Sequence, residues 1–129
     1  MDVSAAGERS RILGSMGSRR PYVHEAELRL DDGVDPAVPG AAVTTGLCGH
    51  WEHDGPCRWP HNNDIRAAEG SSVFRTVFVA AAAEERDVRE RIDRVLRTAP
   101  GWSVLRSGAR AVASDEETLA ASLLRTPLP

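Results

Sequence analysis

A strand and an amphipathic helix follow one another at residues 73–97, and together they constrain the fold more than any other part of the chain. The seven residues Val73-Phe74-Arg75-Thr76-Val77-Phe78-Val79 are rich in β-branched and aromatic side chains, which predicts a central strand. In residues 82–97 apolar side chains recur at helical spacing opposite charged ones, at Val88, Ile92, Val95 and Leu96. A helix with one apolar stripe must bury that stripe, and the neighbouring sheet is the surface available for it.

Shorter elements surround this unit. Tyr22, Ala26, Leu28 and Leu30 alternate with polar side chains, which predicts a first strand at residues 22–30. His24 falls on the inward-facing set and is interpreted as a strand residue with a local hydrogen bond. Further strands are predicted at residues 41–47 and 102–106, a polar connection at 64–72, a turn at 107–108 and a short edge strand at 109–113.

The last predicted helix begins with a capping box formed by Ser114 and Glu117, and it buries Leu119, Leu123 and Leu124. These elements predict an α+β fold: a small, mostly antiparallel sheet of about four to five strands with two helices on one face. We describe it as a ferredoxin-like variant in which a loop rich in Cys and His, residues 46–63, replaces the first helix. Residues 1–20 are expected to be a flexible N-terminal tail, and residues 21–129 a single domain.

Charge and hydropathy exclude several classes of function. The chain of 129 residues has a formal net charge of −3, and its acidic and basic residues are interspersed, which argues against a nucleic-acid partner. No apolar run reaches the roughly 18 residues of a membrane span, and no signal-peptide pattern is present. We therefore expect a small soluble cytoplasmic protein, in which the cysteines are thiols or metal ligands rather than a structural disulfide, although the spacing of Cys48 and Cys57 would allow one bridge.

The chemistry of the chain is concentrated in residues 46–63. Both cysteines and three of the four histidines lie there, in the spacing Cys48-x-His50-x-x-His53-x-x-x-Cys57-x-x-x-His61. Thiolate and imidazole are the ligands that Zn²⁺ prefers in tetrahedral sites, so the cluster predicts a zinc site, with copper as the runner-up metal. The preferred ligand set is Cys48, His53, Cys57 and His61, with His50 as a spare or exchangeable ligand.

Two other functions compete with metal binding. Trp51, Trp59 and Pro60 would form an exposed patch for a protein partner if no metal binds, in an interaction module or a small subunit. A metal-dependent hydrolase or a cysteine enzyme is the third alternative, with Glu52 or Asp54 as base or Cys57 as nucleophile. An enzyme is not favoured, since no oxyanion hole or second acid motif is evident. A homodimer formed through an exposed sheet edge is also expected.

Overall fold

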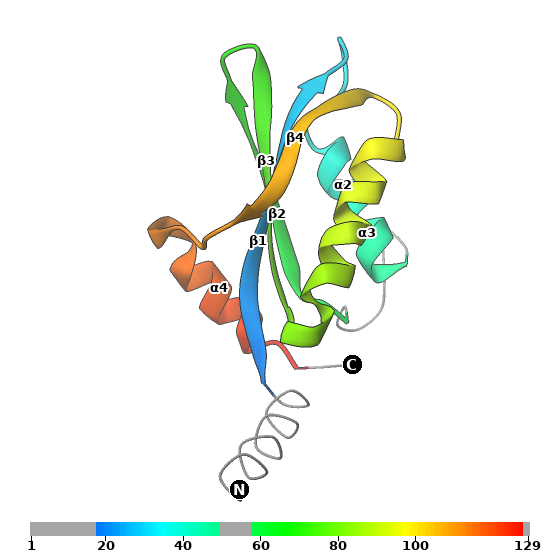
Figure 1. Cartoon of the computed structure of the whole chain (residues 1–129). Helices are drawn as coiled ribbons and strands as arrows, with labels where there is room; N and C mark the ends of the chain where they lie inside the picture. The colour runs from blue at the N-terminus through cyan, green and yellow to red at the C-terminus, as the bar shows by residue number, and fades with distance from the viewer. Residues whose placement is uncertain (1–17, 50–57, 128–129) are drawn as a thin grey trace, which may run out of the picture.

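The computed structural model describes residues 18–49 and 58–127, which form a four-stranded antiparallel sheet and three α-helices (Figure 1). Two short 3₁₀ turns precede α3 and α4, at Ala82–Glu84 and Ser114–Glu116. In chain order the elements are β1 (Arg19–Leu30), α2 (Val38–Cys48), β2 (His61–Ala68), β3 (Ser71–Ala81), α3 (Glu85–Thr98), β4 (Trp102–Arg110) and α4 (Glu117–Leu124).

The sheet has the strand order β2-β3-β1-β4, and every pair of neighbours is antiparallel. The predicted strands at residues 22–30 and 73–79 are confirmed as β1 and β3, which occupy the two central positions. β2 and β4 are the edges. The α+β class predicted from the sequence is therefore confirmed, together with the small antiparallel sheet.

The two faces of the sheet are covered differently. α2 and α3 pack side by side on one face, and α4 lies on the other (Figure 1). The larger apolar core lies under α2 and α3 and contains Phe74, Phe78 and Ile92, whereas Val23 and Val77 pack with Ala120 of α4 in a smaller core. The prediction that the helix at 82–97 and the last helix share a face is wrong. Val23 and Val77, which belong to the alternate set of each strand, give the second face the apolar surface that α4 needs.

Helix α2 stands where a strand was predicted at residues 41–47. Val43, Thr44 and Thr45 favour a strand locally, because β-branched side chains have low helix propensity. Pro39, Val43 and Leu47 are nevertheless buried at four-residue spacing, which is the core-facing stripe of a helix. Packing of that stripe against the sheet overrides local propensity, and Gly49, with φ of +90°, ends the helix.

Two other predictions on the sheet are corrected. Residues 64–72, predicted as a polar connection, form most of β2 and the tight turn into β3, where Gly70 has φ of +77°. β2 is polar because it is an edge strand and exposes one side to solvent. The predicted turn at Ser107-Gly108 is also absent, since β4 runs through it as one strand. The register between β1 and β4 shifts between Glu27 and Leu28, which leaves Leu105 as a bulge, and Ser107 and Gly108 pair regularly with Ala26 and Glu25.

Helices α2 and α3 approach closely at Gly46. A methyl group added there would overlap the Cγ2 atom of Val95 on α3. Val95 is β-branched and has little rotamer freedom in a helix, so it cannot turn away cheaply. Gly46 is therefore required by helix packing.

We expect Gly46→Ala to lower the free energy of unfolding by about 1–2 kcal/mol, because overpacking costs roughly 1–3 kcal/mol and exceeds the gain of up to about 1 kcal/mol in helix propensity. Urea unfolding followed by circular dichroism measures this change. The matched test repeats Gly46→Ala in a Val95→Ala background, where the overlap is gone and the same substitution should become neutral or stabilising. Equal destabilisation in both backgrounds would contradict the proposed overlap.

An ion-pair network ties α4 to the sheet. Arg75 of β3 contacts Glu25 of β1 at 2.6 Å and Glu116 at 2.7 Å. Glu116 also accepts a hydrogen bond from the backbone N–H of Ala113, at the start of the turn that leads into α4. The bonds from Arg75 lower the pKa of Glu116 despite the opposing effect of its burial. This network lies on the same face of the sheet as α4, beside the smaller apolar core of Val23, Val77 and Ala120.

Candidate functional sites

The described structure anchors the Cys/His cluster at both of its ends. Cys48 is the last residue of α2, and His61 is the first residue of the edge strand β2. The other three predicted ligands, His50, His53 and Cys57, lie outside the described residues, as does Trp51. Within residues 18–49 and 58–127, no three Cys, His, Asp or Glu side chains are grouped closely enough to hold a metal ion.

His61 is held in one orientation by its two ring nitrogens. Nδ1 lies 2.9 Å from the carbonyl oxygen of Trp59, and Nε2 lies 3.1 Å from Oγ1 of Thr44. A carbonyl oxygen only accepts, so Nδ1 carries the proton and Nε2 is the acceptor facing α2. Asn63 supports this arrangement by donating to Gly40 O and Thr44 Oγ1, and it accepts from Thr76 at 2.8 Å.

Cys48 lies one helical turn after Thr44, so both residues are on the same face of α2. The side chain of Cys48 is half-buried against the larger core, and its sulfur takes part in a disulfide bond. A disulfide sulfur is not a thiolate, so Cys48 binds metal only after reduction. The structure thus brings the two described members of the cluster to one side of α2, with the sulfur in its oxidised form.

Trp59 belongs to the core. Its side chain is 4% exposed, and the guanidinium groups of Arg58 and Arg91 both lie 5.0 Å from the centre of its ring. Pro60 is buried beside it. The prediction that Trp59 and Pro60 form an exposed patch is therefore wrong, because the apolar ring is used to close the core beneath α3.

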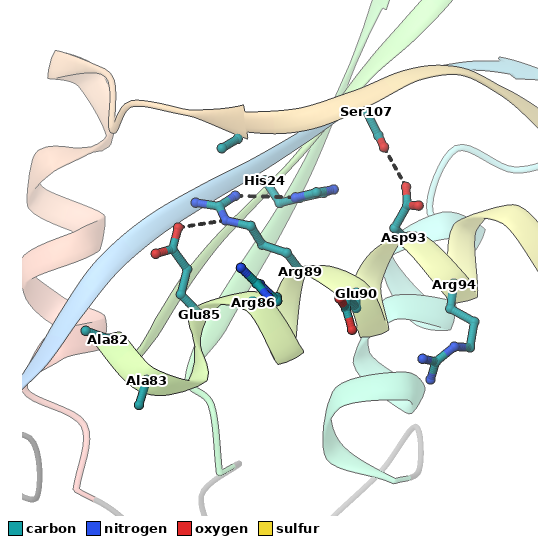
Figure 2. Close-up of a pocket in the computed structure, with 11 residues that line it drawn as sticks. His24, Ala82, Ala83, Glu85, Arg86, Arg89, Glu90, Asp93, Arg94 and Ser107 are labelled. Atoms are coloured by element: carbon teal, nitrogen blue, oxygen red, sulfur yellow. Dashed lines mark hydrogen bonds and ion pairs between the residues drawn. The ribbon is translucent and has the colours of Figure 1, made fainter.

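A second candidate site was not anticipated from the sequence. An open cleft of about 1030 Å³ lies between α3 and the β1–β4 edge of the sheet (Figure 2). The space is open here because β4 carries only the small side chains of Ser107 and Ala109 on this side, whereas Trp102 fills the same side farther along the strand. The helix contributes charged side chains of both signs, at Glu85, Arg86, Arg89, Glu90, Asp93 and Arg94.

His24 lies in the floor of this cleft and is 5% exposed. Arg89 Nη1 donates to the carbonyl oxygen of Val23 at 2.7 Å and approaches His24 Nδ1 at 3.3 Å. Burial, reinforced by the charge of Arg89, lowers the pKa of His24 to about 4, so the ring is neutral near pH 7. His24 Nε2 is buried and has no hydrogen-bond partner among the described residues.

Two further ion pairs shape the cleft. Arg89 Nε bonds to Glu85 at 2.9 Å, and the guanidinium also lies over the rings of Tyr22 and Phe78. Asp93 accepts from Ser107 Oγ at 2.5 Å and from Arg97 Nε at 2.8 Å. Burial opposes ionisation of Asp93, but these two bonds outweigh it and lower its pKa. Asp93 is therefore a fixed negative charge on the same wall of the cleft as Arg89, one turn farther along α3.

The sequence contains only a weak signal for this site. His24 on the apolar set of a strand was visible, but its partners come from α3 and β4, far away in the chain. Comparison of the chain with protein-family models, with curated proteins and with solved structures found no match. No helix in the described ranges is long and apolar enough to cross a membrane.

Proposed function

We propose that the reduced chain binds one transition-metal ion, zinc in the first place, through the cluster of Cys48, His50, His53, Cys57 and His61. The observation that carries the proposal is the orientation of His61. Its Nδ1–H donates to a backbone carbonyl, which is the outer contact that metal-bound histidines almost always make. Its Nε2 faces the side of α2 that bears Cys48.

The proposed ligands suit the ion chemically. Two thiolates and two imidazoles, from Cys48, His53, Cys57 and His61, complete a tetrahedral shell, and His50 is the exchangeable fifth group. Copper(I) is the second choice, because the same ligands suit it. Four protein ligands leave no open position for substrate, so the proposed role is structural support of the loop, or metal sensing and delivery, rather than catalysis.

The disulfide at Cys48 is the competing state of the same sulfur. Thiolate binding requires a reducing compartment, and a cytoplasmic location is therefore part of the proposal. The two states predict opposite outcomes: the reduced chain holds metal and two titratable thiols, whereas the oxidised chain holds neither.

The test is to purify the untagged chain under reducing conditions and measure its metal by elemental mass spectrometry beside a thiol count in denaturant. We expect about one ion per chain, because the proposed ligands complete a single tetrahedral shell. Cys57→Ser and His61→Asn should weaken metal affinity by more than about tenfold, which is the least that loss of a supporting group costs.

His24→Gln is the matched control, since it removes the one histidine outside the cluster and should leave the stoichiometry unchanged. A reduced chain that contains no stoichiometric metal and takes up none from added Zn²⁺ would refute the proposal. Unchanged affinity in Cys57→Ser would remove that residue from the ligand set.

We also infer the finer fold and assembly that the sequence suggested. The element order β-α-β-β-α-β from β1 to β4, with strand order β2-β3-β1-β4, supports a ferredoxin-like arrangement to which α4 is added. The first helix is present as α2, so the Cys/His loop follows that helix instead of replacing it. The exposed edges β2 and β4 support a homodimer.

Binding of a protein partner is the alternative function, and fewer residues support it than the sequence suggested. Trp59 and Pro60 are buried, so of the three residues proposed for the patch only Trp51, outside the described residues, is left to carry it. Loss of partner capture in Trp51→Ala, in a chain that contains no metal, would favour this alternative.

A further inference from the structure

We propose that the cleft between α3 and β4 binds a small hydroxycarboxylate, with its carboxylate at Arg89 and its hydroxyl group between His24 Nε2 and Asp93. The site is independent of the Cys/His cluster. Its residues come from β1, the 3₁₀ turn before α3, α3 itself and β4, and all of them are described.

The neutral ring of His24 carries its proton on the nitrogen that faces away from Arg89. A guanidinium group only donates hydrogen bonds, so the atom that faces Arg89 Nη1, Nδ1, must be the acceptor. The proton of the neutral ring is therefore on Nε2. This N–H is buried and lacks an acceptor among the described residues. Buried donors in folded proteins are nearly always paired, so an unpaired one at a cleft indicates a missing partner.

Asp93 and Ser107 are the polar groups nearest to the other end of the imidazole in Figure 2. Nε2 lies on the opposite edge of the ring from Arg89, toward the side of the cleft where Asp93 and Ser107 meet (Figure 2). A ligand group placed there must accept a hydrogen bond from the Nε2–H of His24. It must also donate one to the carboxylate of Asp93, which only accepts. A hydroxyl group does both, whereas a second carboxylate would be repelled by Asp93. In the described structure Ser107 supplies that donor to Asp93, and the ligand hydroxyl would take its place.

Arg89 has one guanidinium nitrogen that a ligand can use. Its Nε and Nη1 atoms are bonded to Glu85, Val23 and His24, and Nη2 makes no hydrogen bond to a described residue. Arg86, the second residue of α3, also lines the cleft and is exposed. A carboxylate accepts from a guanidinium edge in a planar geometry, which makes it the natural anion for this position.

The charges of the cleft favour a monoanion over phosphate. The side chains that line it carry three arginines and three carboxylates, so its formal charge is zero with His24 neutral. A phosphate dianion would meet Glu85, Glu90 and Asp93 without an excess of positive charge. Ala82, Ala83 and Ala109 add small apolar surface that suits a short carbon chain.

The experiment titrates the full chain at pH 7 with 4-hydroxybutyrate, butyrate and inorganic phosphate, and follows the His24 ring by ¹⁵N-edited NMR. We expect saturable shifts at the protonated Nε2 with 4-hydroxybutyrate, and about tenfold weaker binding of butyrate, which leaves that donor unpaired. Arg89→Gln should weaken both carboxylates by at least about tenfold, because it removes a charge-assisted pair.

His24→Phe and His24→Gln separate the role of the donor from that of the fold. In His24→Phe the preference for 4-hydroxybutyrate over butyrate should disappear, while the Gln amide, which keeps an N–H donor, should retain part of it. These titrations follow backbone amides of α3 and β4. Arg66→Gln, on the exposed edge strand β2, is the matched arginine control and should bind as the unaltered chain does.

Thermal unfolding of each variant first establishes that it folds, and Arg89→Lys, which keeps the charge, is the second arginine variant in case Arg89→Gln does not. The proposal is overturned if neither carboxylate gives saturable shifts, if phosphate shifts the same resonances with equal affinity, or if the hydroxyl preference persists in His24→Phe.

Discussion

Trp59→Ala is expected to lower the free energy of unfolding by about 3–5 kcal/mol, the usual cost of truncating a large buried aromatic side chain to alanine. Trp59 is 4% exposed in the larger core, and Arg58 and Arg91 stack on its ring at 5.0 Å. The substitution leaves a cavity and removes both cation–π contacts. Urea unfolding at pH 7, in the presence of a chelator, measures the loss without a contribution from bound metal.

Trp59→Phe is the matched control for this substitution. It keeps an aromatic ring in the core and should cost clearly less than Trp59→Ala, because the remaining cavity is smaller. A loss below about 1 kcal/mol in Trp59→Ala would be typical of an exposed side chain and would contradict the buried position. In that case the exposed tryptophan patch predicted from the sequence would become the better account.

His24 should make the stability of the protein fall between pH 6.5 and pH 4. Its pKa is 6.5 in the unfolded chain and about 4 in the folded one. Above pH 6.5 both states are neutral and the group contributes nothing to the pH dependence. Between the two values the unfolded chain binds a proton that the folded chain excludes, so unfolding becomes easier as the pH falls. The integrated loss is roughly 3 kcal/mol by pH 4.

The measurement compares urea unfolding of the unaltered chain and of His24→Gln from pH 7.5 to pH 4. The difference between the two proteins cancels the titration of carboxyl groups that both share. Arg89, Asp93 and Arg97 on α3 are the charged groups that act on His24, and they are retained in the variant. Stability curves that run parallel through this range would show that the buried ring does not exclude its proton.

Local sequence patterns were sufficient to predict the central strands and the amphipathic helix. β1 and β3 follow from alternation and β-branched composition, and α3 follows from the spacing of Val88, Ile92 and Leu96, all of which are buried. The cluster of Cys48, His50, His53, Cys57 and His61 is visible in the same way, because the five residues are close in sequence.

α2 shows where local patterns failed. Residues 41–47 favour a strand by composition. The contrary signal is the four-residue spacing of Pro39, Val43 and Leu47. That stripe begins with a proline, which was interpreted as part of a turn-rich loop. Recognising that stripe would have corrected both the helix and the number of helices on this face of the sheet. The position of α4 on the opposite face depends on Val23 and Val77, which pack against Ala120. These two valines lie side by side only because the register pairs them across β1 and β3.

The sequence by itself determined the α+β class, the central strands, the amphipathic helix and the concentration of Cys and His side chains. The tertiary structure alone decided that Trp59 lies in the core, that α2 rather than a strand leads into the cluster, and that His24, Arg89, Asp93 and Ser107 share one cleft. The physical reason is the range of the interactions. Periodicity and spacing act within a turn or a strand, whereas burial, the tautomer of His24 and its lowered pKa arise only when segments distant in the chain exclude water together.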